Sequence, residues 1–176
     1  MEAIVNVKMR YFINSKITVM KTFYLSLVFF LAFANVSLAQ NISDNAIGLR
    51  FGSSHGLGSE ISYQRKLSKI NRLEGNLGWS NSSDYNAYKI TGIYQWVWNI
   101  EDNFNWYAGV GAGIENWNSK NNDSDSFLYA SGNVGIEYEF DIPLLLSLDF
   151  RPEIGKNNYY NDTFNSNVAL AIKYLF

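Results

Sequence analysis

The sequence predicts an all-β protein, namely an eight-stranded antiparallel up-and-down β-barrel that crosses a membrane. Apolar and polar residues alternate with a period of two in eight runs between Asn45 and Phe176, as in strands with one apolar face. Aromatic residues make up 16% of the chain and charged residues only 17%, which is typical of proteins with aromatic belts at membrane interfaces. Short turns alternate with longer polar loops between the runs, as in outer-membrane barrels.

Residues 1–39 are expected to be a cleaved signal peptide that precedes the barrel. Lys21 comes before the apolar run 23–38, and small residues up to Ala39 stand where a signal peptidase reads the chain. The run is short for a bilayer-spanning helix and contains polar interruptions, although a single membrane anchor remains the alternative. Residues 1–19 are expected to lie upstream of the true start of the protein.

The mature chain, residues 40–176, is expected to form one barrel domain because its composition does not shift along its length. Removing residues 1–39 takes four of 14 basic residues and one of 16 acidic residues, which leaves a net charge of −5. No basic patch remains to hold a phosphate backbone, so nucleic acid is not an expected partner. The sequence contains no cysteine, which excludes disulfides, thiolate metal sites and a lipoprotein anchor.

The first four runs, 47–52, 57–66, 73–79 and 88–98, each place aliphatic or aromatic residues at every second position. Polar segments 53–56, 68–71 and 80–87 separate them. The fourth run also has Ile93 and Val97 on its more polar face. The residues expected to face lipid are Ile47, Leu49, Phe51, Leu57, Ile61, Tyr63, Leu73, Gly75, Leu77, Trp79, Tyr88, Ile90, Gly92, Tyr94, Trp96 and Trp98.

The last four runs, 104–115, 128–140, 144–154 and 163–176, continue the alternation. Short turns are expected at 101–103 and 141–143, and polar loops at 118–125 and 155–162. The residues expected to face lipid are Phe104, Trp106, Ala108, Val110, Ala112, Ile114, Leu128, Ala130, Val134, Ile136, Tyr138, Phe140, Leu144, Leu146, Leu148, Phe150, Ile154, Phe164, Val168, Leu170, Ile172, Tyr174 and Phe176. Their aromatic members gather near both ends of the runs and predict two girdles.

Closure of the barrel predicts a specific strand pair. Every backbone polar group in the hydrocarbon needs a partner, so the last strand must pair with the first. Residues 47–52 and 168–174 are therefore predicted to be antiparallel neighbours, with Arg50 facing the lumen beside Ala169, Ala171 and Lys173.

The closing run and its terminal Tyr174-x-Phe176 resemble the C-terminal strand by which outer-membrane barrels are recognised during assembly. From Asn45 to Phe176 the chain resembles the small OmpA/OmpX-like barrels, and its Asn-rich loops are similar to those of the Bacteroidota members. The resemblance implies a monomeric porin-like protein in the outer membrane of a Gram-negative bacterium. It also implies contact with outer-membrane lipid and lipopolysaccharide, and recognition of the C-terminal strand by the barrel assembly machinery. Unlike in full-length OmpA, no peptidoglycan-binding domain is expected after Phe176.

The lumen of an eight-stranded barrel is just wide enough for side chains to fill. Charges inside it must pair or stay hydrated, so a salt-bridge network that plugs the lumen is expected, with a small pore or proton path as the alternative. Gly109, Gly111 and Gly113 are expected to make room for long side chains from the facing wall. The inward charges are Arg50, Glu60, Glu74, Lys89, Glu115, Glu137, Asp149, Arg151, Glu153 and Lys173.

The single histidine, His55, raises the alternative of an enzyme. Lipid A acyltransferases and deacylases, the PagP and PagL types, use a histidine with a serine and a carboxylate near the outer rim of such barrels. His55 lies in a rim loop with Ser53, Ser54, Ser59 and Glu60 nearby, and a hydroxyl nucleophile needs a base and an orienting acid. Neither family's ordered motif is present. The prediction is therefore a non-enzymatic protein with no catalytic residue and no cofactor.

Two further possibilities have weaker support in the sequence. Asp123-Ser124-Asp125 lacks the glycine and the closing glutamate of a calcium loop, so a solvated loop and no metal site are expected. A soluble lipocalin-like barrel would need apolar residues inside, which is the reverse of the faces assigned above.

Overall fold

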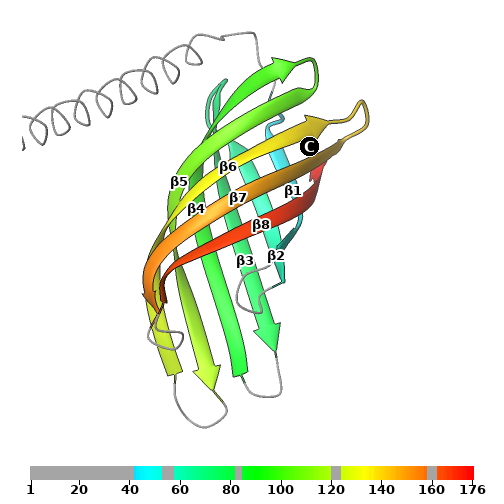
Figure 1. The fold of residues 1–176 in the computed structure, drawn as a ribbon. Coiled ribbons are helices and arrows are strands. Elements are labelled where there is room, and N and C mark those ends of the chain that lie inside the picture. Colours follow the sequence, from blue (N-terminus) through cyan, green and yellow to red (C-terminus); the bar gives the residue numbers. More distant parts are fainter. Residues whose placement is uncertain (1–41, 53–57, 82–84, 120–123, 158–161) are drawn as a thin grey trace, which may run out of the picture. The chain divides into compact units, whose positions relative to one another are not determined.

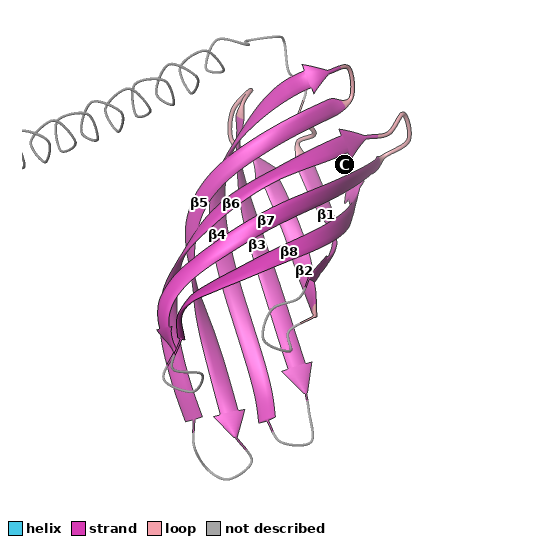
Figure 2. Cartoon of the chain, viewed as in Figure 1, coloured by secondary structure: helices cyan, strands magenta, loops and turns pink. Residues whose placement is uncertain are grey.

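The computed structural model describes residues 42–52, 58–81, 85–119, 124–157 and 162–176. Eight antiparallel strands pair in sequence order and close into a barrel, as predicted (Figures 1 and 2). Among these residues no helix is long and apolar enough to cross a membrane. The predicted signal peptide lies outside the described residues. The strands are β1 (Asn45–Gly52), β2 (Ser59–Lys66), β3 (Asn71–Asn81), β4 (Tyr85–Glu101), β5 (Phe104–Ser119), β6 (Ser124–Glu139), β7 (Leu144–Asn157) and β8 (Asp162–Leu175).

β1 and β8 close the barrel in the predicted antiparallel arrangement. Their register runs from Ala46 opposite Leu175 to Gly52 opposite Ala169. Beyond β8, the backbone N–H of Asn45 donates to the carbonyl oxygen of Phe176 at 3.0 Å, and Phe176 donates in return. The closed ring of strands gives the backbone polar groups the partners that a hydrocarbon environment cannot supply.

The two faces of each strand point as predicted, with apolar side chains outside and polar side chains inside. Along β1, Leu49 is 43% exposed while Arg50 is 2% exposed. Along β8, Leu170 is 48% exposed and Ala171 is fully buried. The assignment also holds for β4, where Ile93 and Val97 are buried in the lumen. The outer surface is therefore the apolar one, which suits a barrel surrounded by lipid.

The connections at one end of the barrel, called the turn end, are short as predicted (Figure 1). In the β2–β3 turn, Leu67 N–H donates to the Asn71 carbonyl at 2.9 Å. In the β4–β5 turn, Asp102 adopts a φ of 42°, in the left-handed region that aspartate tolerates better than most residues. In the β6–β7 turn, Phe140 N–H donates to the Leu144 carbonyl at 2.9 Å. The opposite end is called the loop end.

The strands at the loop end are longer than the sequence indicated, so parts of three predicted loops are wrong. β4 has 17 residues and β5 and β6 have 16 each, rather than about ten. Pairing continues into the predicted loop 80–87, where Ser80 lies opposite Ala87. Likewise Asn118 lies opposite Ser124, inside the predicted loop 118–125, and β7 and β8 extend into 155–162. Strand hydrogen bonds continue past the point where the apolar alternation stops, because only the bilayer requires that alternation.

Aromatic side chains form the predicted girdle at the turn end. Trp98 and Trp106 lie opposite each other on β4 and β5 and stack with their ring centroids 4.4 Å apart. Tyr138 and Phe140 meet edge to face at 4.9 Å. Amphipathic rings in a band of this kind suit the interface between hydrocarbon and water.

Candidate functional site

The lumen contains the densest group of polar side chains in the described part of the chain. Eleven charged side chains point into it, and none is more than 5% exposed. Such a group is stable only if its members pair with each other, because an isolated charge out of water is costly. The set consists of the cations Arg50, Arg72, Lys89, Arg151 and Lys173 and the carboxylates Glu60, Glu74, Glu115, Glu137, Asp149 and Glu153.

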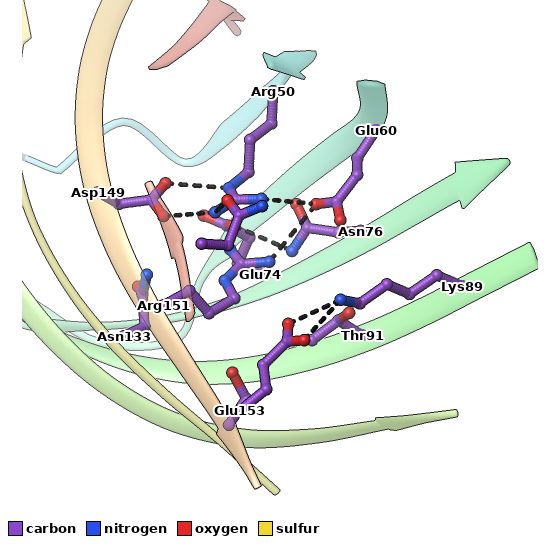
Figure 3. A network of polar contacts seen from close by, with 12 residues as sticks. Arg50, Glu60, Glu74, Asn76, Lys89, Thr91, Asn133, Asp149, Arg151 and Glu153 are labelled. Atoms are coloured by element: carbon purple, nitrogen blue, oxygen red, sulfur yellow. Dashed lines mark hydrogen bonds and ion pairs between the residues drawn. The ribbon is translucent and has the colours of Figure 1, made fainter. Parts of the chain in front are cut away.

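Arg50 of β1 binds side chains of three other strands, namely its neighbours β2 and β8 and the next strand, β7 (Figure 3). Its Nε and Nη2 donate to the two carboxylate oxygens of Asp149 on β7, at 3.0 and 2.6 Å. Its Nη1 donates to Glu60 on β2 at 3.1 Å, and Nη2 also donates to Asn167 on β8 at 2.9 Å. The two-pronged Arg50–Asp149 pair has the geometry in which a guanidinium binds a carboxylate most strongly.

Glu74 of β3 is the acceptor on which several donors converge. Arg151 Nη2 lies 3.0 Å from one of its oxygens, and Lys173 Nζ lies 3.2 Å from the other. Gln64 donates to it at 2.7 Å. Arg151 also reaches Glu60 at 3.5 Å, which connects this group with the one around Arg50.

Arg72 was not among the predicted inward charges, and the structure places it in the network. Its Nη1 and Nη2 donate to the two oxygens of Glu137 at 2.9 and 2.7 Å, and its Nε donates to Gln95 at 2.6 Å. The guanidinium lies 4.8 Å from the ring centroid of Tyr107. The predicted turn ended at residue 71 and the predicted third strand began at residue 73, so Arg72 was assigned to neither. Its position two residues before Glu74 was the signal that places it on the inward face.

Another group of charged side chains lies near the loop end and contains two carboxylates but one cation. Lys89 Nζ lies 2.8 and 2.7 Å from the two oxygens of Glu153 and 3.9 Å from Glu115. The indole N–H of Trp117 donates to Glu115 at 2.6 Å. The ammonium of Lys89 also lies 4.9 Å from the ring centroid of Tyr129. Glu115 and Glu153 thus share one cation, Lys89.

Buried apolar side chains lie beyond the charges at both ends of the lumen. At the turn end, Ala46, Leu145 and Leu175 form one cluster, and Ile42, Val97 and Tyr107 form another. At the loop end, Ala87 and Trp117 pack together with Phe127 against them. The polar network therefore lies between two apolar layers.

Lumen glycines lie beneath tyrosine rings of neighbouring strands. A Cβ added to Gly135 of β6 would lie 2.5 Å from the ring of Tyr107, its partner on β5. Gly113 of β5 is covered in the same way by Tyr129 of β6. Gly113 therefore makes room for a side chain of the adjacent strand, and the expectation that it accommodates side chains from the facing wall is wrong. The tyrosine rings cover the backbone of the two glycines, and such pairs help to fix the register between β5 and β6.

The residues considered for an enzyme do not assemble into a catalytic group among the described residues. Ser59 and Glu60 are consecutive in β2, so Ser59 is exposed while Glu60 points into the lumen and binds Arg50 and Arg151. His55, Ser53 and Ser54 lie outside the described residues.

The candidate calcium loop is also placed differently from the expectation. Ser124 and Asp125 belong to β6, opposite Asn118 and Trp117 of β5, rather than to a loop. Asp123 lies outside the described residues.

Comparison with known proteins identifies the fold. No protein-family model and no curated protein matches the chain. Among solved structures, the Neisserial surface protein A shares 13% identity with a TM-score of 0.55, over 75% of this chain and 94% of that one. The N-terminal β-barrel domain of Pseudomonas aeruginosa OprF shares 13% identity with a TM-score of 0.61, over 76% and 98%. Ail of Yersinia pestis, in complex with the heparin analogue sucrose octasulfate, shares 15% identity with a TM-score of 0.50, over 76% and 97%. These similarities establish the fold of an eight-stranded transmembrane barrel.

Proposed function

We propose that this chain, which shares the fold of bacterial outer-membrane barrels, is itself a non-enzymatic outer-membrane protein with a plugged lumen. It contributes to envelope structure or to contacts at the cell surface. The observation that supports this most directly is the inverted distribution of side chains: Leu49 and Leu170 face outward while Arg50 and Glu74 are buried inside. Such a distribution suits a protein whose solvent is lipid.

Location and orientation follow from the same proposal. Residues 1–39 direct export, and the short turns lie on the periplasmic side while the longer connections face outside. The aromatic belt around Trp98 and Trp106 then lies at the periplasmic interface of the bilayer. We also propose contact with membrane lipid and lipopolysaccharide, and recognition of Tyr174 and Phe176 by the barrel assembly machinery.

The plugged lumen is supported by its ion pairs and by the apolar layers at each end. Cations and carboxylates of the lumen pair within 4.0 Å, and the bonds of Arg50 cross between β1, β2, β7 and β8. An ion entering the lumen would have to break pairs that have little access to water.

Single-channel recording in planar bilayers tests the plug. The refolded protein is expected to give no discrete conductance steps, while an open porin recorded in the same bilayers shows that insertion can be detected. A heat-modifiable band on unboiled gels shows that the sample is folded. Reproducible conductance steps from folded protein would contradict the plug and favour a pore.

The lipid A enzyme is tested separately through its histidine. His55→Ala is expected to leave the lipid A mass spectrum of the host unchanged, because Glu60 is held by two arginines and does not share a face with Ser59. A lost or gained acyl chain in the variant would show that the protein acts on lipid A.

A further inference from the structure

Arg65 is a charged residue on the outward face of β2, close to the turn end. Outward positions alternate along this strand, and Arg65 follows Ile61 and Tyr63, which are both 39% exposed. It lies opposite Asn45 on β1 and Leu73 on β3. Arg65 therefore belongs to the surface that faces lipid, whereas the other arginines of the strands are buried in the lumen.

The polar contact of Arg65 orients its guanidinium but leaves its positive charge without a counter-charge among the described residues, because the acceptor is a neutral amide. Its Nη1 donates to Asn45 Oδ1 at 2.9 Å, and the hydroxyl of Tyr63 donates to the same oxygen at 2.8 Å. The Asn45 side chain in turn donates to the main-chain oxygen of Phe176 at 3.3 Å. A guanidinium carries five N–H donors, and within the described residues one of them is used. The exposed Arg65 guanidinium therefore has further N–H groups that can donate to a ligand at the membrane surface.

The adjoining β2–β3 turn adds charge and apolar surface to Arg65. Lys69 is exposed, and Leu67 and Ile70 are 54% and 42% exposed. Lys66 is paired with Asp44 at 3.4 Å, so its charge is already compensated.

The other two turns have the opposite charge. They carry carboxylates and no basic residue, so the turn end is positive on one side only. These carboxylates are Asp102 and Asp141 in the turns and Glu101 and Glu139 at the adjoining ends of β4 and β6.

We propose that Arg65, with Lys69 and Tyr63, forms a binding site for the headgroup of an anionic phospholipid in the leaflet at the turn end. A guanidinium pairs with phosphate oxygens through two parallel hydrogen bonds, and Lys69 adds a second positive charge. Leu67 and Ile70 of the adjoining turn add exposed apolar surface suited to acyl chains. A lipid fits better than a soluble acidic protein because Arg65 lies on the lipid-facing side of the strand. The proposal rests on the membrane insertion proposed above.

Native mass spectrometry of the refolded protein tests this site. The protein is released from nanodiscs that contain equal amounts of phosphatidylglycerol and phosphatidylcholine, and the ratio of the two retained lipids is measured. Arg65→Gln is expected to lower the phosphatidylglycerol preference about fivefold, since one basic residue near a membrane surface has an effect of that order. Arg65→Lys, which keeps the charge, is expected to retain most of the preference. Lys156→Gln removes the same charge from the loop-end part of β7 and is expected to leave the ratio unchanged.

Two outcomes would overturn the site. One is an unchanged lipid ratio in Arg65→Gln. The other is an equal loss in Lys156→Gln, which would indicate a general effect of net charge. A failure of membrane insertion gives a different result, because no variant would then show the heat-modifiable folded band.

Discussion

Glu74→Gln should destabilise the barrel much more than Glu115→Gln, although both substitutions neutralise a buried carboxylate in the lumen. In the described part of the chain, Glu74 is the ion-pair partner of Lys173 and one of two ion-pair partners of Arg151. Its loss leaves the buried Lys173 without an ion-pair partner among the described residues, and breaking a buried pair in this way costs about 3–5 kcal/mol. Glu115 lies 3.9 Å from Lys89, which keeps its closer contacts with Glu153. The glutamine at 115 can still accept the Trp117 hydrogen bond, so the cost there is about 1 kcal/mol or less.

Urea unfolding in lipid vesicles, followed by tryptophan fluorescence, measures this difference. With a denaturant slope of about 2 kcal/mol/M, a loss of about 4 kcal/mol lowers the unfolding midpoint by about 2 M. The double variant Glu74→Gln/Lys173→Met removes both charges of the Glu74–Lys173 pair and is expected to recover much of the loss, since replacing a buried ion pair by neutral groups is often close to neutral. Equal midpoints for Glu74→Gln and Glu115→Gln would refute the pairing scheme.

Two other predictions concern the faces and glycines of the barrel. Leu170→Arg places a charge on the lipid face at a cost of about 2–4 kcal/mol and should abolish the faster-migrating band on unboiled gels, while Ala169→Ser in the lumen should retain it. If both variants kept the folded band, or if only Ala169→Ser lost it, the assignment of residues to the inner and outer faces would be wrong by one residue. Gly135→Ala forces its Cβ to within 2.5 Å of the Tyr107 ring and should lower stability by about 1–3 kcal/mol, whereas Gly75→Ala faces open space and should change it little. Equal urea midpoints for the two alanine variants would contradict the close packing of Tyr107 over Gly135.

The fold was predictable because the bilayer imposes a simple rule on each strand. Alternation assigns every residue to a face, and closure makes β8 pair with β1. Even β4 was assigned correctly with Ile93 and Val97 inside, because Trp96 and Trp98 fix the other face. The rule weakens outside the bilayer, where Ser80 and Asn118 pair as strand residues without any apolar alternation.

The partners within the lumen could not be predicted to the same extent. Alternation places Arg50 and Asp149 inside, but it does not give their heights along the barrel or their rotamers. The Arg50–Asp149 and Arg72–Glu137 pairs depend on strand stagger, and β1 and β7 are not adjacent in the barrel. Arg72 was missed because the predicted strand began at residue 73, two residues after β3 begins at Asn71, and boundaries are the least certain part of a sequence-based assignment.

Site-directed spin labelling of residues 168–173 of β8 tests the central claim, that the polar face is inside and the apolar face meets lipid. The sequence contains no cysteine, so each single cysteine variant carries one label. In vesicles, labels at the even-numbered positions are expected to collide readily with oxygen, which concentrates in the hydrocarbon. Labels at the odd-numbered positions should be shielded, because Ala169, Ala171 and Lys173 are at most 2% exposed. The opposite phase, or an oxygen accessibility that does not alternate with a period of two, would contradict the account.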